Sequence, residues 1–215
     1  MRIERRLRRA GIAAAVLVVA GAAAAADARS IGDCRIAAGT LCAEADLADA
    51  DLRGADLSHA NLLKADLGGA RLQNVKLVEA QLRGANLDRA ALRNADLHGA
   101  DLERASLVRA DLEGAKLSDA NLQDARLHGA RLVDARLLGA KMRGVGLVLA
   151  NLQGADLRRA DLSAAELNGA SLRNADLRGA IFHNADLHGA DLRGARIDAT
   201  TDFSGADTKF CTGCR

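Results

Sequence analysis

Leucine returns at every fifth residue through most of the chain, and this period decides the local structure. In residues 51–70 the apolar positions are Leu52, Leu57, Leu62 and Leu67. On a helix, five residues of about 100° each would spread successive Leu side chains around the axis. On a flat strand, an odd period would place them on opposite faces. The chain is therefore expected to turn once per five residues and to stack as a solenoid.

The five positions of the repeating unit differ in how much they vary. Counting from Leu47 to Ile197 gives 31 units, of which 28 have Leu at the centre and 29 have Ala two residues earlier. The residue just before the centre, called here the pre-centre residue, is Asp in 12 units and Asn in four. The two positions after the centre vary freely. We expect the centre and the Ala to point inward and the other three positions to face solvent, so that stacking buries a continuous core.

This A-(D/N)-L-x-x pattern resembles the pentapeptide repeat family over roughly residues 40–210. The resemblance implies an all-β fold, a right-handed quadrilateral β-helix with four units in each coil. The 31 units then make about eight coils, and a strand spacing of about 4.8 Å gives a rod roughly 38 Å long. At this register Lys76 lies between Asp56 and Asp96, and Met142 shares a face with Phe182.

The first 26 residues have the order of a secretory signal peptide. Residues 1–10 are rich in Arg, residues 11–26 are apolar, and small residues stand at Ala24 and Ala26. We expect cleavage near Ala26 and a periplasmic or secreted protein; an uncleaved N-terminal anchor is the alternative. The remaining boundaries are an N-terminal cap at 27–44, the β-helix at 45–199 and a C-terminal cap at 200–215.

Charge and composition narrow the classes of function. The chain has no Trp, Tyr or Pro, and its formal charge of +2 owes much to residues 1–26, which hold five Arg and one Glu. Removal of that segment leaves a net charge of −2. A nucleic-acid-binding protein is expected to carry a strong basic stripe. Nucleic acid is therefore an unlikely partner on the sequence alone.

Four cysteines lie in the two expected caps: Cys34 and Cys42 before the repeats, and Cys211 and Cys214 after them. Cysteines of an exported chain are typically disulfide-bonded. The two ends of a rod of the implied length are too far apart for a bond, which needs Cα atoms within about 7 Å. We expect Cys34–Cys42 and Cys211–Cys214. An intermolecular bond, a redox dithiol and a metal site remain alternatives for the C-terminal C-x-x-C.

No catalytic, cofactor-binding or metal-binding constellation stands out among the five His and the many Asp. We expect no enzyme activity, no cofactor and no small-molecule substrate. Four consecutive pre-centre residues are basic and would ring one coil as a candidate interaction belt: Arg126, Arg131, Arg136 and Lys141. Apolar residues are also expected to face outward at Val108, Val148 and Leu149. Near the C-terminus the register is expected to slip by one residue, so that Phe203 takes a centre, and Phe203 and Phe210 are expected to plug the last coil.

These features favour an exported, non-enzymatic scaffold or protein-binding rod with an unknown protein partner. The resemblance offers a second function, because some pentapeptide repeat proteins mimic duplex DNA and bind type II topoisomerases. That function depends on a markedly acidic surface, whereas eight of the 31 pre-centre residues are Lys or Arg. A third hypothesis is a membrane-anchored interaction protein of the envelope. End-to-end pairing into a homodimer is also expected from the open ends of a solenoid.

Overall fold

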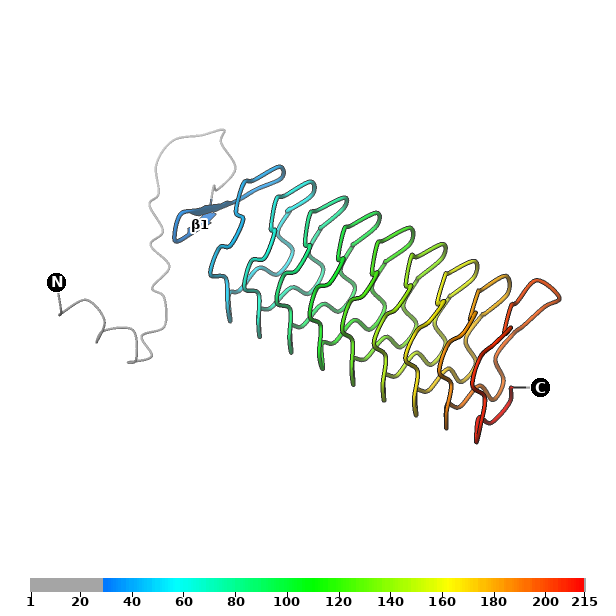
Figure 1. The fold of residues 1–215 in the computed structure, drawn as a ribbon. Coiled ribbons are helices and arrows are strands. Elements are labelled where there is room, and N and C mark those ends of the chain that lie inside the picture. Colours follow the sequence, from blue (N-terminus) through cyan, green and yellow to red (C-terminus); the bar gives the residue numbers. More distant parts are fainter. Residues whose placement is uncertain (1–28, 215) are drawn as a thin grey trace, which may run out of the picture.

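The computed structural model describes residues 29–214, and in them the chain winds into a rod of stacked coils (Figure 1). Parallel bridges join residues 20 apart, beginning with Leu41 and Asn61, and they continue without interruption along all four sides. Each side contributes a single bridge per coil, so the sides are too short to count as strands. The fold is a right-handed quadrilateral β-helix of about eight coils, as the resemblance predicted.

The 20-residue register holds at the positions that test it. Lys76 bridges Asp56 on one side and Asp96 on the other. Successive bridges from Lys141 through Asp161 to Ile181 place the units of Met142 and Phe182 on the same side, two coils apart. Both predictions from the register are therefore confirmed.

Leucine forms the core because each central side chain lies directly over the equivalent one in the next coil. From Leu47 to Leu192 every central side chain is at most 2% exposed, Met142 and Phe182 included. No polar or charged residue is buried among the residues that the structure describes. Full burial of a Leu side chain contributes about 1.5–3 kcal/mol. The repeated Leu therefore supplies the main stabilising term of the rod.

Backbone hydrogen bonds join the coils in the same repeating way. The N–H of Leu47 donates to the carbonyl of Asp66 over 2.7 Å, and the N–H of Asp66 donates to the carbonyl of Ala45 over 2.9 Å. At each corner the Ala N–H closes a turn onto the preceding central carbonyl, as from Ala60 to Leu57. Most backbone polar groups are thus paired within the rod, as buried backbone requires.

The corner turns explain the preference for Asp and Asn at the pre-centre position. The first residue after each centre has an outward N–H, which the pre-centre side chain accepts; Gly68 donates to Asp66 Oδ1 over 3.0 Å. The same bond forms at every Asp and Asn pre-centre residue from 46 to 191. Asx turns of this kind are a general reason for Asp and Asn at turns.

The second residue after each centre is left-handed, with a positive φ at every fifth position from Gly39 to Gly194. Asn and Asp tolerate this region, and Gly occupies it without cost. Where Asn or Asp stands there, the residue one coil later is usually Gly, and the side-chain oxygen fills the space of the missing Cβ. The pairs are Asp49–Gly69, Asn94–Gly114, Asp119–Gly139, Asp124–Gly144, Asp134–Gly154, Asn174–Gly194 and Asn184–Gly205.

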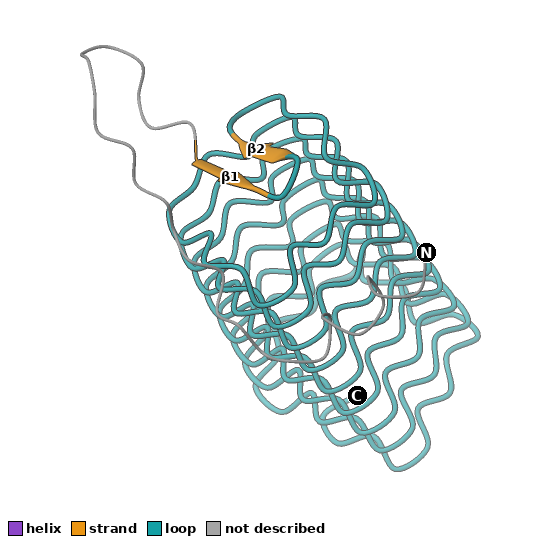
Figure 2. Cartoon of the chain, turned by 90° about the vertical axis from the view of Figure 1, so that its left-hand side faces the viewer, coloured by secondary structure: helices purple, strands orange, loops and turns teal. Residues whose placement is uncertain are grey.

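The N-terminal end is covered by a hairpin of two antiparallel strands, β1 (Arg29–Ile31) and β2 (Cys34–Ile36). The hairpin lies at the end of the first coil (Figure 2). Cys34 and Ile36 are buried, and Ile31 packs against the core. The expected signal peptide, including the cleavage site near Ala26, lies outside the described residues.

At the C-terminal end the register slips by one residue, and Ile181 bridges Asp202 instead of residue 201. The ladder then continues as far as Thr212. Phe203 takes the central position and its ring stacks on that of Phe182, with ring centroids 5.0 Å apart. Ile197, which the sequence placed among the centres, is 42% exposed. It comes just before the extra residue, where the chain leaves the regular coil.

We predict that Leu92→Asp unfolds the rod and that Ala91→Asp does not. Leu92 is fully buried, and an unpaired carboxylate there costs several kcal/mol. Ala91 faces outward between Arg71 and Asp111, where Asp would accept the N–H of Arg93 as other pre-centre Asp residues do. Thermal unfolding followed by circular dichroism measures both; equal stability of the two variants would contradict the packing described.

A second prediction concerns the contact between coils at the corners. Gly114 and Gly189 both have a φ of +67°, but a Cβ on Gly114 would lie 2.5 Å from Asn94 Oδ1, whereas a Cβ on Gly189 meets nothing within 4 Å. Gly114→Ala should therefore be less stable than Gly189→Ala by up to about 1 kcal/mol, the lower end of the cost of overpacking, because the Asn94 side chain can partly rotate away.

Urea unfolding of the two Gly variants measures this difference. Adding Asn94→Ala to Gly114→Ala should remove the excess cost, because the clashing oxygen is gone. Equal losses in the two single variants would show that backbone conformation alone sets the requirement for Gly.

Candidate functional site

The outward side chains form straight columns because every position repeats after 20 residues. One such column, called here the Asp56 column, consists of the pre-centre residues Asp56, Lys76, Asp96, Lys116, Arg136, Asp156, Asp176 and Arg196. In its first half the signs alternate, and Lys76 Nζ lies 3.6 Å from Asp56 Oδ2 while Lys116 Nζ lies 3.1 Å from Asp96 Oδ2. Exposed pairs of this kind contribute little to stability.

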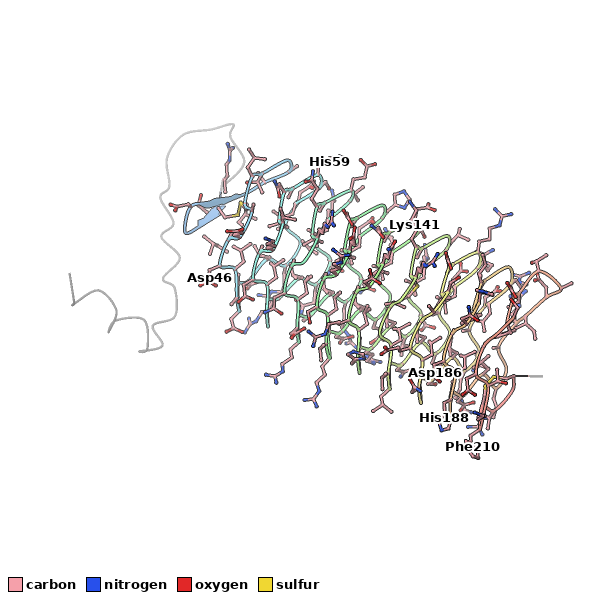
Figure 3. All side chains as sticks on the ribbon, in the orientation of Figure 1. Asp46, His59, Lys141, Asp186, His188 and Phe210 are labelled. Carbon is pink, nitrogen blue, oxygen red and sulfur yellow. A yellow bond between two sulfur atoms is a disulfide. The ribbon has the colours of Figure 1, made fainter. Side chains whose placement is uncertain are left out.

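The four belt residues do not gather on one face. Each of them lies on a different side of a single coil. Their bridge partners in the preceding coil are Ser106, Asp111, Lys116 and Asn121, in the order of the belt residues. They therefore form a ring around the rod, and Lys141 marks one edge of it in Figure 3. Arg131 pairs with Asp111 and Glu113. The role of this ring in binding stays a prediction.

The belt coil also lacks the turn hydrogen bonds found elsewhere. Five successive pre-centre residues from Arg126 to Gly146 carry no carboxylate or amide oxygen. The outward N–H groups that follow them have no side-chain acceptor within the part of the chain that the structure describes; they belong to His128, Val133, Leu138, Arg143 and Val148. This coil therefore offers both cationic side chains and unused backbone donors to a partner, a combination that sequence reasoning missed.

The apolar residues expected to face outward differ in exposure. Leu149 is 71% exposed, whereas Val108 and Val148 are half-buried. His128 occupies the column position between the two valines, and its ring covers Gly146, where a Cβ would lie 2.5 Å from His128 Cε1. Its Nδ1 is buried without a hydrogen-bond partner. Gly at position 146 thus makes room for the His128 ring. The period of the sequence alone does not show this contact between the two coils.

Bidentate Arg–Asp pairs concentrate toward the C-terminal end. Arg178 donates from Nε and Nη2 to the two oxygens of Asp176, over 2.8 and 2.7 Å. Arg158 does the same to Asp156, over 2.7 Å at both oxygens. These hydrogen bonds lower the pKa of Asp176 and of Asp156 below the ordinary value. Both carboxylates therefore stay charged at neutral pH and hold the two guanidinium groups in fixed planes.

The four cysteines lie where the sequence placed them, in two close pairs at the two ends. The Cα atoms are 5.2 Å apart in Cys34 and Cys42, and 6.0 Å apart in Cys211 and Cys214, within the range of a disulfide. The N-terminal pair is buried, with exposures of 3% and 4%, whereas the C-terminal pair is partly exposed. Cys42 also takes the central position of the first coil, since its N–H donates to Asn61 as the Leu residues do.

Phe210 does not plug the last coil, so that expectation was wrong. Its side chain is 81% exposed and projects from the rod next to His188, with ring centroids 5.2 Å apart (Figure 3). The reason is the one-residue slip, which places Phe210 at the left-handed corner position with a φ of 57°. A side chain at that position points outward in every coil.

Residues 29–214 contain no group of three or more His, Cys, Asp or Glu residues that could hold a metal ion. None of the segments in this range forms a helix long and apolar enough to cross a membrane.

Comparisons with known proteins agree with the geometry. The family model "Pentapeptide repeats" matches residues 40–77, 80–119, 120–159 and 155–194, in eight copies. The comparison with curated proteins gave no match.

Solved structures of three pentapeptide repeat proteins are similar to this chain. HetL, involved in heterocyst differentiation regulation in the cyanobacterium Nostoc sp. strain PCC 7120, is 32% identical over 79% of this chain and 87% of its own, with a TM-score of 0.36. Rfr23 from the cyanobacterium Cyanothece 51142 is 36% identical over 45% and 63%, with a TM-score of 0.39. A protein of the Arabidopsis thaliana thylakoid lumen is 34% identical over 52% and 71%, with a TM-score of 0.32. Since the family model matches more than half of the residues, the chain belongs to the pentapeptide repeat family.

Proposed function

We propose that this protein is an exported, non-enzymatic scaffold that binds a protein partner along its sides. The observation that carries the proposal is the strict 20-residue register, which holds outward side chains in straight columns at a fixed spacing. A surface of this kind is preorganised, so that binding requires little further ordering of the rod. The basic belt, with its unused backbone donors, is the part of the surface that we assign to the partner.

Export is supported by the sequence of residues 1–26 and by the two cysteine pairs. Disulfides persist in oxidising compartments, and the Cα atoms of both pairs lie within disulfide range, 5.2 and 6.0 Å apart. We therefore place the protein in the periplasm or outside the cell, with an uncleaved N-terminal anchor as the alternative. N-terminal sequencing of the exported protein distinguishes a cleaved signal peptide from an anchor. If residues 1–20 are still attached, the segment is an anchor.

The topoisomerase hypothesis has less support. A mimic of duplex DNA needs a continuous acidic surface, but the belt interrupts every side of the rod with a basic residue. The segment of residues 1–26 would also direct the chain away from the cytoplasm. End-to-end self-association is a separate proposal, favoured by the exposed apolar side chains of Ile197 and Phe210 near the C-terminal end.

The belt is tested by charge removal. The double variant Arg126→Gln/Lys141→Gln should reduce by at least about tenfold the recovery of a cross-linked partner from periplasmic extract, because two charged contacts are lost. Arg71→Gln is the matched control, since Arg71 is also an exposed pre-centre residue but lies outside the belt. Equal recovery with the double variant and the control would exclude the belt as the binding surface.

The disulfides are tested by mass spectrometry of unreduced, exported protein. We expect bonds within Cys34–Cys42 and within Cys211–Cys214, and we expect mild reductant to expose the C-terminal pair to alkylation first because it is less buried. Both bonds close short loops, so each should contribute at most the typical ~2–4 kcal/mol. Four free thiols would refute the pairing, and a dimer linked through Cys211 or Cys214 would replace it with an intermolecular bond.

A further inference from the structure

A cleft of about 380 Å³ opens on the side of the Asp56 column, near the C-terminal end. Its lining residues come from three successive coils and from the loop that follows the slip in register: Leu138, Arg158, Arg159, Arg178, Gly179, Asp198 and Thr200. Three of these seven residues are arginines. The cleft adjoins the belt coil through Leu138, but none of the four basic belt residues lines it.

Two of the arginines are fixed before any ligand arrives. Arg158 and Arg178 each use Nε and Nη2 to bind the Asp two residues earlier, which leaves the two N–H donors of Nη1 unused in each pair. The residues are equivalent in successive coils, so their backbones lie about 4.8 Å apart. The two positive charges repel each other, and this repulsion opposes the rise in the pKa of Arg178 that its bond to Asp176 produces.

The third arginine has no acidic partner. No carboxylate oxygen of residues 29–214 lies within 4.0 Å of the Arg159 guanidinium. Gly179, one coil further, packs beside the Arg159 side chain, where an added Cβ would lie at an ordinary contact distance of 3.5 Å from Arg159 Cγ. Arg159 is exposed, and it stands at a left-handed corner position with a φ of 57°.

The one acidic residue in the lining is already engaged by its own loop. Asp198 Oδ1 accepts hydrogen bonds from Thr200 N over 2.9 Å and from Thr200 Oγ1 over 2.7 Å, and it also accepts the N–H of Gly179 over 3.3 Å. These bonds hold the loop in place as one wall of the cleft. Asp156 and Asp176 balance the charges of Arg158 and Arg178, so Arg159 is the lining arginine whose charge has no carboxylate of the described residues beside it.

We propose that this cleft binds a phosphoryl group. Three guanidinium groups around one cleft can share the three terminal oxygens of a phosphate monoester, whereas a carboxylate offers only two oxygens. Arginine donors of fixed orientation are the usual means of binding phosphate. A bound phosphate would also offset the repulsion between Arg158 and Arg178 that remains beside their own Asp partners. The phosphoryl group comes from a soluble phosphate ester or from a lipid headgroup.

Isothermal titration of the full-length protein with inorganic phosphate tests the site. The expected result is saturable binding that Arg159→Gln weakens by about tenfold, because a charged hydrogen-bond donor is lost. Arg159→Lys should weaken it less. Arg193→Gln is the control for loss of a surface arginine outside the cleft: Arg193 pairs with Asp191 as Arg158 and Arg178 pair with their Asp residues, but it does not line the cleft.

Circular dichroism confirms that each variant keeps the fold. Two further arms identify the source of the phosphoryl group: titration with glycerol 3-phosphate, and sedimentation with phosphatidate vesicles against phosphatidylcholine vesicles. Arg159-dependent binding in either arm supports the site. The proposal is overturned if the protein shows no saturable phosphate binding, or if Arg159→Gln and Arg193→Gln weaken it equally. Neither result bears on the belt, which is tested with different residues.

Discussion

Stacking of one coil on the next, residue on residue at a separation of 20, is the interaction on which the rest of this structure depends. It buries the central Leu side chains, pairs the backbone and sets the position of every outward side chain. Each coil contacts only its neighbours, so stability is the sum of equivalent interfaces and not the product of one central core. This arrangement explains why the sequence can be so uniform inside and so variable outside.

The same constraint governs the corners. A left-handed residue is needed at every fifth position, and where Asn or Asp stands there the coil that follows usually has Gly. Where Asn94 turns its oxygen toward the next coil, Gly114 leaves the space. Gly84 instead follows Lys64 by one coil. A Cβ added to Gly84 would lie 3.5 Å from Lys64 Cγ, an ordinary contact distance, so no side-chain oxygen fills the space there. Neighbouring coils therefore select each other's residues, even at positions that face solvent.

The sequence predicts the fold well because its period is too regular to suit a helix or a flat strand, and the family resemblance adds the four-sided coil. The period and the resemblance together also predict the alignment of Asp56, Lys76 and Asp96. Side-chain positions are predicted less well where the period breaks. Phe203 was placed correctly at a centre, but Phe210 was wrongly expected to be buried because the slip moves it to a corner.

The candidate sites depend on contacts that no period encodes. The cleft of Arg158, Arg159 and Arg178 needs the loop at 198–201 as its wall, and the sequence alone gives no position for that loop. The packing of His128 over Gly146 likewise appears only when both coils are in place. Sequence reasoning found the belt, since four consecutive basic pre-centre residues are visible in the period, but not the missing turn hydrogen bonds that accompany it.

Amide hydrogen exchange, resolved coil by coil, tests the central claim most directly. If each coil is stabilised only by its neighbours, the N–H groups of the central residues should exchange slowest in the middle of the rod and progressively faster toward both ends. The fastest exchange should occur in residues 198–214, where the register has slipped and no hairpin covers the end. Uniform protection from residue 42 to residue 214, or protection that ignores the coil boundaries, would contradict this account.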